Sequence, residues 1–256
     1  MTSTSPGIAA FVAARAAVLA RIDAACRRVG RDPDTVTLVA VSKTVDPVRL
    51  RDAVAAGLTL LGENRVQEGE AKAPEVPGAA WHLVGPLQSN KVRRALEVFD
   101  AVQSIDSVGL AERLDRLARD VRDAGPQRRY PILLQVNVDD DPAKAGFAPE
   151  ELPETLDAIL GLDALEVQGL MTIGRAVADP AEARPTFRSL RALSERLRGE
   201  GAALGPALSM GMTDDFEVAL EEGATIVRVG RALFGERPHL HPDGAAAPDG
   251  HRHEPA

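Results

Sequence analysis

The chain has 256 residues, of which 45% are hydrophobic and 27% charged, as is typical of a compact globular protein, and this length suits one (β/α)8 barrel. The net charge of −8 and a pI near 5.2 argue against binding to nucleic acid or to an anionic membrane surface. With a single cysteine, a polar start that lacks the basic flank of a signal peptide, and no stretch of roughly 18 apolar residues, we expect a cytoplasmic protein without disulfides.

An alanine-rich segment comes first, residues 8–29, with apolar residues at helical spacing until Gly30 ends the pattern. A short apolar run follows, and Asp46-Pro47 then provides the N-cap and first turn of a helix through residue 56. The same alternation of strand and helix continues along the chain. The expected strands are 36–41, 58–61, 81–84, 99–105, 131–138, 165–171, 207–210 and 225–229, and the later helices include 107–123, 149–160, 180–198 and 214–222.

Eight strands that alternate with helices predict a parallel sheet closed into a barrel, so the expected fold is α/β, a single (β/α)8 TIM barrel. The strand after Gly205-Pro206 is short and could equally be a loop. We expect residues 1–236 to form the barrel with its N-terminal helix. Residues 237–256 lack any periodicity, which predicts a disordered tail. Four of the five histidines lie in this tail, where they could capture a metal, but a solvated tail without a metal site is the preferred interpretation.

The chain contains four lysines: Lys43, Lys72, Lys91 and Lys144. Lys72 and Lys91 fall on polar helical stretches, where we expect solvated side chains. Lys43 directly follows the first strand, in phase with Val39 and Val41, so its side chain can point into the barrel mouth. An amine there would be partly desolvated, which favours the neutral form that attacks an aldehyde. The alternative is a lysine in an exposed loop.

Two segments near the end of the barrel are candidates for phosphate binding. Gly230 after the eighth strand permits close backbone approach, and the amides at the start of the turn from Arg231 point toward an anion. After the seventh strand, Ser209-Met210-Gly211-Met212-Thr213 adds a hydroxyl donor and another glycine. Barrels commonly bind phosphate at these two loops. Ordinary turn chemistry is the alternative.

Three further polar residues have two interpretations each. Arg228 lies within an apolar strand and requires a partner, either a barrel carboxylate or a ligand. His82 is more simply a hydrogen-bonded core histidine than a catalytic group. Asn64 could offer its amide to a ligand at the barrel mouth or cap a helix.

Taken together, several segments resemble one family, the pyridoxal phosphate homeostasis proteins, in the order in which that family has them, over roughly residues 36 to 237. The barrel is also similar to the N-terminal domain of bacterial alanine racemases. The matching segments are Ala40-Val41-Ser42-Lys43-Thr44, Gly62-Glu63-Asn64 with Gln67-Glu68, the run from Trp81 to Lys91, the run from Leu208 to Asp215, and Val227-Arg228-Val229-Gly230 with Phe234-Gly235.

The resemblance implies that pyridoxal 5′-phosphate is the cofactor and that Lys43 forms the Schiff base with it. It also implies that Arg228 faces the pyridine nitrogen and that Ser209, Gly230 and the amide of Arg231 take the phosphate. The full set of candidate cofactor-binding residues is Lys43, Asn64, Ser209, Met210, Arg228, Gly230 and Arg231.

Two positions depart from the family pattern. Arg231 stands where relatives often have threonine, which removes a hydroxyl contact to phosphate and leaves the backbone amide. Arg65 and Val66 stand where relatives often have a tyrosine between Asn64 and Gln67. Lys144 is the remaining candidate for a second, looser cofactor site.

The resemblance implies a carrier that holds the cofactor and passes it to other enzymes, without catalytic turnover. Arginine only donates hydrogen bonds, so a ring nitrogen that faces Arg228 stays unprotonated and carbanion chemistry is disfavoured. Tyr130, the single tyrosine, precedes the fifth strand at the opposite rim of the barrel. The alternatives are an amino-acid racemase or related pyridoxal enzyme, and a phosphosugar-type barrel enzyme without this cofactor. Cofactor-dependent apoenzymes are the expected partners, and a monomer is the expected state.

Overall fold

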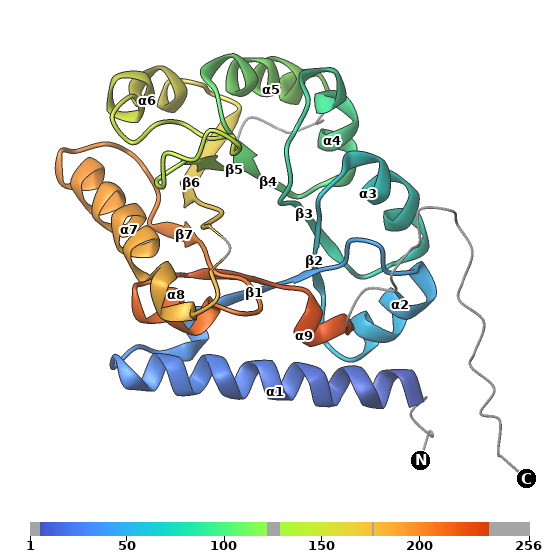
Figure 1. Ribbon diagram of the computed structural model, residues 1–256. Helices are drawn as coiled ribbons and strands as arrows, with labels where there is room; N and C mark the ends of the chain where they lie inside the picture. The colour runs from blue at the N-terminus through green and yellow to red at the C-terminus, as the bar shows by residue number, and fades with distance from the viewer. Residues whose placement is uncertain (1–5, 122–128, 176, 236–256) are drawn as a thin grey trace, which may run out of the picture.

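The computed structural model describes residues 6–121, 129–175 and 177–235. Within these ranges eight parallel strands close into one barrel in the order β1 to β8, and helices surround it (Figure 1). The predicted (β/α)8 barrel is therefore confirmed. The strands are β1 Thr37–Val41, β2 Leu60–Glu63, β3 Ala80–Leu83, β4 Ala101–Ile105, β5 Tyr130–Gln135, β6 Leu165–Met171, β7 Ala207–Ser209 and β8 Ile226–Val229.

The helices follow the strands and pack on the outside of the barrel. The α-helices are α1 Pro6–Arg28, α2 Pro47–Ala55, α3 Val66–Lys72, α4 Val92–Val98, α5 Val108–Val121, α6 Leu152–Leu160, α7 Arg184–Gly199, α8 Phe216–Glu221 and α9 Arg231–Phe234. The 3-10 turns are η1 Pro33–Thr35, η2 Ala73–Glu75, η3 Ser89–Lys91 and η4 Pro180–Ala183.

The long helix α1 lies across the outside of the barrel, against α2, α8 and α9 (Figure 1). Two ion pairs join it to α8, from Arg21 Nε to Glu217 Oε1 at 2.6 Å and from Arg28 Nε to Glu221 Oε1 at 2.8 Å. The N-terminal helix thus connects the last two helices of the described residues with α2.

Alternation along the strands separates two apolar layers. One lies inside the barrel and includes Val39, Val84, Leu133, Met171 and Ile226. The other, larger layer lies between the strands and the helices. Because side chains of one strand point alternately inward and outward, a residue's place in its strand decides which layer it joins.

Two strands begin later than the sequence predicts, because the residues before them donate backbone hydrogen bonds to the preceding helix. Leu58 donates its amide to Ala53 O at the end of α2, so β2 starts only at Leu60. Phe99 donates to Ala95 O and closes α4, so β4 starts at Ala101. The uncertain strand near residue 207 is present as the three-residue β7. The predicted tail, residues 237–256, lies outside the described residues.

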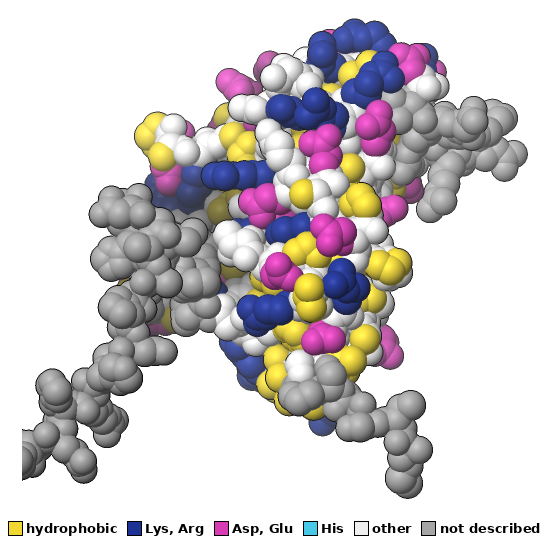
Figure 2. Space-filling model, turned by 90° about the vertical axis from the view of Figure 1, so that its right-hand side faces the viewer, with side chains coloured by type: hydrophobic (Ala, Val, Ile, Leu, Met, Phe, Trp, Pro, Cys, Tyr) yellow, Lys and Arg dark blue, Asp and Glu magenta, His cyan; other side chains and the backbone are white. Residues whose placement is uncertain are grey.

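The side of the molecule that carries α2 and α3 shows basic and acidic side chains intermixed with hydrophobic ones (Figure 2). A continuous basic field, which nucleic acid would require, is not visible on this face. None of the helices in the described part of the chain has the length and apolarity needed to cross a membrane.

Candidate functional site

A pocket of about 260 Å³ opens where the C-terminal ends of the strands meet. In barrels of this kind the loops at this end carry the functional groups. Lys43 follows β1, Asn64 follows β2, and Arg228 lies in β8, so residues far apart in the sequence meet here. The pocket is lined by Val41, Lys43, Asn64, Val84, Ile173, Met212, Thr213, Asp214, Arg228, Gly230 and Arg231.

Lys43 is half-buried at the pocket, and the backbone on both sides of it is held by hydrogen bonds. On one side, Ser42 donates its amide to Gly62 O at 2.9 Å. On the other side, Thr44 has a φ of 65° and donates its amide to Glu68 Oε2 at 3.1 Å. A positive φ is costly for threonine, so this turn is held by its surroundings.

Lys72 is buried, and the prediction that it lies on a solvated face is wrong. Its Nζ donates to Glu63 Oε1 at 2.7 Å, to Ser42 O at 3.0 Å and to Glu68 Oε2 at 3.2 Å. Glu63 follows the inward-facing Gly62 and therefore points outward, toward α3, where Lys72 is the last residue. Burial raises the pKa of the Glu63 carboxyl, while the hydrogen bond and charge of Lys72 act against this rise.

Arg228 is buried inside the barrel and is one of the residues that line the pocket. Its NH1 donates to Ser209 Oγ at 2.6 Å and its NH2 to Thr172 O at 2.7 Å. Burial lowers the pKa of Arg228 to about 10, and the negative charge of Asp215 acts in the opposite direction. The sequence left open a carboxylate or a ligand as the partner of this arginine. In the structure its partners are a hydroxyl and a backbone carbonyl, and the residue also lines the pocket.

Ser209 and Met210 are fully buried and do not line the pocket. Ser209 Oγ donates to Gln103 Oε1 at 2.6 Å, and Met210 packs between the strands and the helices. Thr213, from the same sequence segment, presents its hydroxyl at the pocket and accepts a hydrogen bond from Gly230 N at 3.3 Å. The sequence pattern pointed to this segment, but only the turn after β7 shows that Thr213 rather than Ser209 lines the pocket.

The other candidates at the mouth lie on its rim. Arg231 forms a close ion pair with Asp214, and both side chains are exposed. Asn64 packs against the loop after β3, where a Cβ on Gly85 would lie 2.3 Å from Asn64 O. Only glycine permits this approach, and it brings the loops after β2 and β3 together beside Lys43.

His82 and Gln103 lie deeper in the barrel. The Nδ1 of His82 is 2.8 Å from Gln103 Nε2. Burial lowers the pKa of His82, and the nearby charge of Asp100 acts against this. This histidine does not line the pocket at the mouth, which agrees with the prediction of a hydrogen-bonded core residue. Sequence reasoning did not single out Gln103.

Tyr130 and Lys144 lie away from the pocket. Tyr130 is the first residue of β5, at the opposite end of the barrel, and donates its hydroxyl to Phe99 O at 2.9 Å. Lys144 lies in the loop after β5, where its Nζ is 3.5 Å from Asp141 Oδ2 and 3.9 Å from Asp139 Oδ2.

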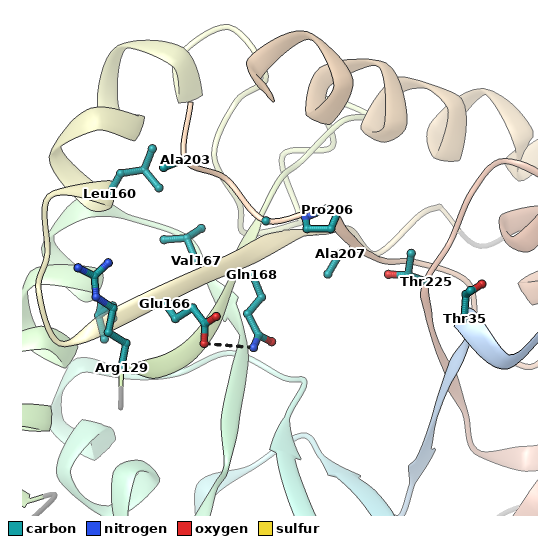
Figure 3. A pocket seen from close by; sticks show the side chains of 12 residues that line it. Thr35, Arg129, Leu160, Glu166, Val167, Gln168, Ala203, Pro206, Ala207 and Thr225 are labelled. Carbon is teal, nitrogen blue, oxygen red and sulfur yellow. Dashed lines mark hydrogen bonds between the residues drawn. The ribbon is translucent and has the colours of Figure 1, made fainter. Parts of the chain in front are cut away.

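A second pocket of about 560 Å³ lies at the N-terminal ends of the strands (Figure 3). It is largely apolar, with Arg129, Glu166 and Gln168 as its main polar groups, and Gln168 donates to Glu166 at 3.4 Å. It contains no lysine. The candidate residues Lys43 and Arg228 line the pocket at the C-terminal ends instead.

Comparisons with known proteins found relatives along most of the chain. Residues 14–238 match the family model described as alanine racemase, N-terminal domain. The chain is 44% identical over 230 residues to the pyridoxal phosphate homeostasis protein of Pseudomonas aeruginosa, covering 89% of this chain and 96% of that protein. It is 42% identical over 225 residues to the protein of the same name from Aquifex aeolicus, covering 86% and 95%.

Solved structures give the same result. The structure of PipY from Synechococcus elongatus with PLP bound superposes with a TM-score of 0.72 at 40% identity, covering 85% of this chain and 100% of that one. An alanine racemase from Clostridium difficile superposes with a TM-score of 0.65 at 14% identity, covering 86% and 60%, which shows a shared barrel fold.

Proposed function

Because the chain belongs to the pyridoxal phosphate homeostasis protein family, we propose that it binds pyridoxal 5′-phosphate at Lys43 and takes part in the homeostasis of this cofactor. The observation that carries the proposal is that Lys43 and Arg228 line one pocket at the C-terminal end of the barrel. A relative at 40% identity has been solved with PLP bound, which supports the choice of cofactor.

The residues of the pocket fit this cofactor. When bound, it supplies an aldehyde that condenses with a primary amine, with loss of water. Lys43 is the lysine of the pocket and provides that amine. Arg228 donates one hydrogen bond from NH1 to Ser209 and one from NH2 to Thr172, and its further N–H donors suit the acceptor nitrogen of a pyridine ring.

Phosphate suits the other side of the site, where the loops after β7 and β8 meet. Thr213 offers a hydroxyl, Gly230 offers close backbone approach, and Arg231 adds positive charge at the rim. Ser209 and Met210 support the site indirectly. Ser209 accepts a hydrogen bond from Arg228, and Met210 packs in the hydrophobic core next to the turn after β7. Asn64 borders the site from the β2 side.

We propose that the protein carries the cofactor without catalytic turnover. Arg228 only donates hydrogen bonds, so a ring nitrogen beside it stays unprotonated and stabilises a carbanion poorly. A racemase also needs bases on two faces of its substrate. Among the described residues that line the pocket, Asp214 is the one carboxylate and is paired with Arg231. Tyr130, the only tyrosine of the chain, lies at the other end of the barrel.

A borohydride-reduced peptide map tests the linkage. Full-length protein is loaded with pyridoxal 5′-phosphate, reduced and digested, and the modified lysine is located by mass spectrometry. We expect the adduct on Lys43 and its loss in Lys43→Ala, with Lys144→Ala as the matched control that keeps it. An adduct that persists on Lys144 in the Lys43→Ala variant, or no adduct at all, contradicts the assignment.

Incubation with L-alanine and other amino acids tests the absence of turnover. We expect racemisation no faster than with the same concentration of cofactor alone. Faster turnover that depends on Lys43 would identify a racemase or a related enzyme instead.

For the carrier role, apo-forms of pyridoxal-dependent enzymes are the proposed recipients, and the expected result is reactivation of such an apoenzyme by loaded protein. A monomer is the proposed state, which light scattering measures.

A further inference from the structure

Four side chains form a chain of hydrogen bonds through the interior of the barrel, from β8 to β3. Arg228 NH1 is 2.6 Å from Ser209 Oγ, which is 2.6 Å from Gln103 Oε1. Gln103 Nε2 is 2.8 Å from His82 Nδ1. Ser209 and Gln103 are completely buried, so water does not complete their hydrogen bonds. The four residues come from β8, β7, β4 and β3, and only closure of the barrel brings them into contact.

Every hydrogen bond in this series donates in the same direction, and Arg228 sets that direction. A guanidinium only donates, so Ser209 Oγ accepts from Arg228 and its own hydroxyl hydrogen must go to Gln103 Oε1. The amide nitrogen of Gln103 then faces His82 and donates to Nδ1. His82 must therefore accept at Nδ1, so it is neutral and carries its proton on Nε2. The reversed amide would leave the buried Ser209 hydroxyl without an acceptor, which is costly.

The surroundings of His82 agree with a neutral ring. Burial lowers its pKa, although the carboxylate of Asp100 favours the charged form. Arg228, at the other end of this series of hydrogen bonds, is the other charged group connected to His82. A proton on Nδ1 would meet the amide nitrogen of Gln103 donor to donor, and the amide would have to turn. The state of His82 is thus coupled to the contacts of Arg228 across the barrel.

We propose that Gln103 and His82 are positioning residues, which hold the guanidinium of Arg228 in place through this one-directional hydrogen-bond chain. The proposal rests on the proposed function in taking Arg228 as the group that faces the ring nitrogen of the cofactor. Neither Gln103 nor His82 lines the pocket at the mouth, so they act on the cofactor only through Ser209 and Arg228. The hydrogen bonds of the chain can nevertheless be measured without any cofactor.

The test in cofactor-free, full-length protein is the state of His82 by long-range ¹H–¹⁵N NMR, assigned by the loss of its signals in His82→Gln. We expect a neutral ring with the proton on Nε2. In Gln103→Glu a carboxylate faces both Ser209 and His82, so we expect the proton to move to Nδ1 or the ring to become charged, with a pKa raised by about one unit or more. Gln88→Glu, at an exposed glutamine, is the matched control and leaves His82 unchanged.

A second readout addresses the cofactor. Gln103→Met interrupts the series of hydrogen bonds without adding a charge. We expect the affinity for pyridoxal 5′-phosphate to fall roughly 2- to 12-fold, which corresponds to the net free energy of one hydrogen bond. A proton on Nδ1 in the unaltered protein, an unchanged His82 in Gln103→Glu, or full affinity in Gln103→Met would each overturn the proposal. Failure of the proposed function gives a different result, the absence of a trapped adduct on Lys43 with the His82 tautomer as expected.

Discussion

Lys72 Nζ lies 2.7 Å from Glu63 Oε1, and this buried ion pair is joined to the backbone on both sides of Lys43. Lys72 donates to Ser42 O, Glu63 accepts from the Ser42 hydroxyl at 2.7 Å, and Glu68 accepts from the Thr44 amide. The strained turn that presents Lys43 is therefore supported from behind by charges on β2 and α3.

Replacement of Lys72 by methionine is expected to destabilise the protein by about 3–5 kcal/mol, because it leaves the Glu63 carboxylate buried without its cation. The double variant Lys72→Met with Glu63→Gln removes the stranded charge and should recover at least about 1 kcal/mol of this loss. Urea unfolding of the two variants measures both values. Equal losses would mean that the carboxylate is not the source of the cost.

The cost of Lys72→Met should also depend on pH. Burial raises the pKa of Glu63, and without Lys72 less opposes this rise. A carboxyl whose folded-state pKa exceeds its unfolded value contributes stability that is present below the unfolded pKa and is lost as the pH rises through the folded pKa. We therefore expect the variant to lose stability, relative to the unaltered protein, as the pH rises above about 4.5, and unfolding curves across this range check the sign.

Thr213→Val is expected to weaken binding of pyridoxal 5′-phosphate but not of pyridoxal, which has no phosphate. A hydrogen bond to a charged group contributes about 1.5–3 kcal/mol, so Kd should rise roughly 10- to 150-fold. Thr213→Ser keeps the hydroxyl and is the control. Titration of both ligands separates the effects, and an equal loss for the two would place the phosphate elsewhere.

Gly211→Ala tests the turn between β7 and Thr213. Gly211 has a φ of 89°, and an added Cβ would lie 2.6 Å from Ala219 Cβ and 2.9 Å from Phe216 Cα. We expect a loss of about 1–3 kcal/mol from the steric clash, in addition to the backbone strain. Gly201→Ala is the matched control, since its φ of 94° is similar and nothing lies within 4 Å of the added Cβ. If both variants unfold at the same urea concentration, the contact with α8 is not limiting.

His82 should lower the free energy of unfolding at acidic pH. Its folded-state pKa is lowered below the ordinary value of 6.5, mainly by burial. The stability that this group contributes is therefore present above pH 6.5 and is lost as the pH falls through the folded-state pKa. His82→Gln cannot take up the proton, so its stability should fall less with acid, by up to about 1.4 kcal/mol per pH unit. Parallel pH profiles for the two proteins would contradict this.

The amino-acid sequence by itself determined the barrel and the place of Lys43 at the C-terminal end of its first strand. Alternating strand and helix patterns predicted the eight units, because side-chain period and turn residues act over a few neighbouring positions. The motif around Lys43 and the segments after β7 and β8 indicated the cofactor through their resemblance to the pyridoxal phosphate homeostasis proteins. Boundaries at Leu58 and Phe99 were missed because one backbone hydrogen bond to the preceding helix decides each of them.

Only the tertiary structure decided which polar side chains meet. Lys72 looks like a surface residue in the sequence, yet α3 turns it against Glu63. Thr213 rather than Ser209 reaches the mouth, and Gln103 joins Ser209 to His82. Each of these contacts depends on strand register and on closure of the barrel. These are properties of the whole fold, because one residue of register shift moves a side chain from the interior to the opposite face of the sheet.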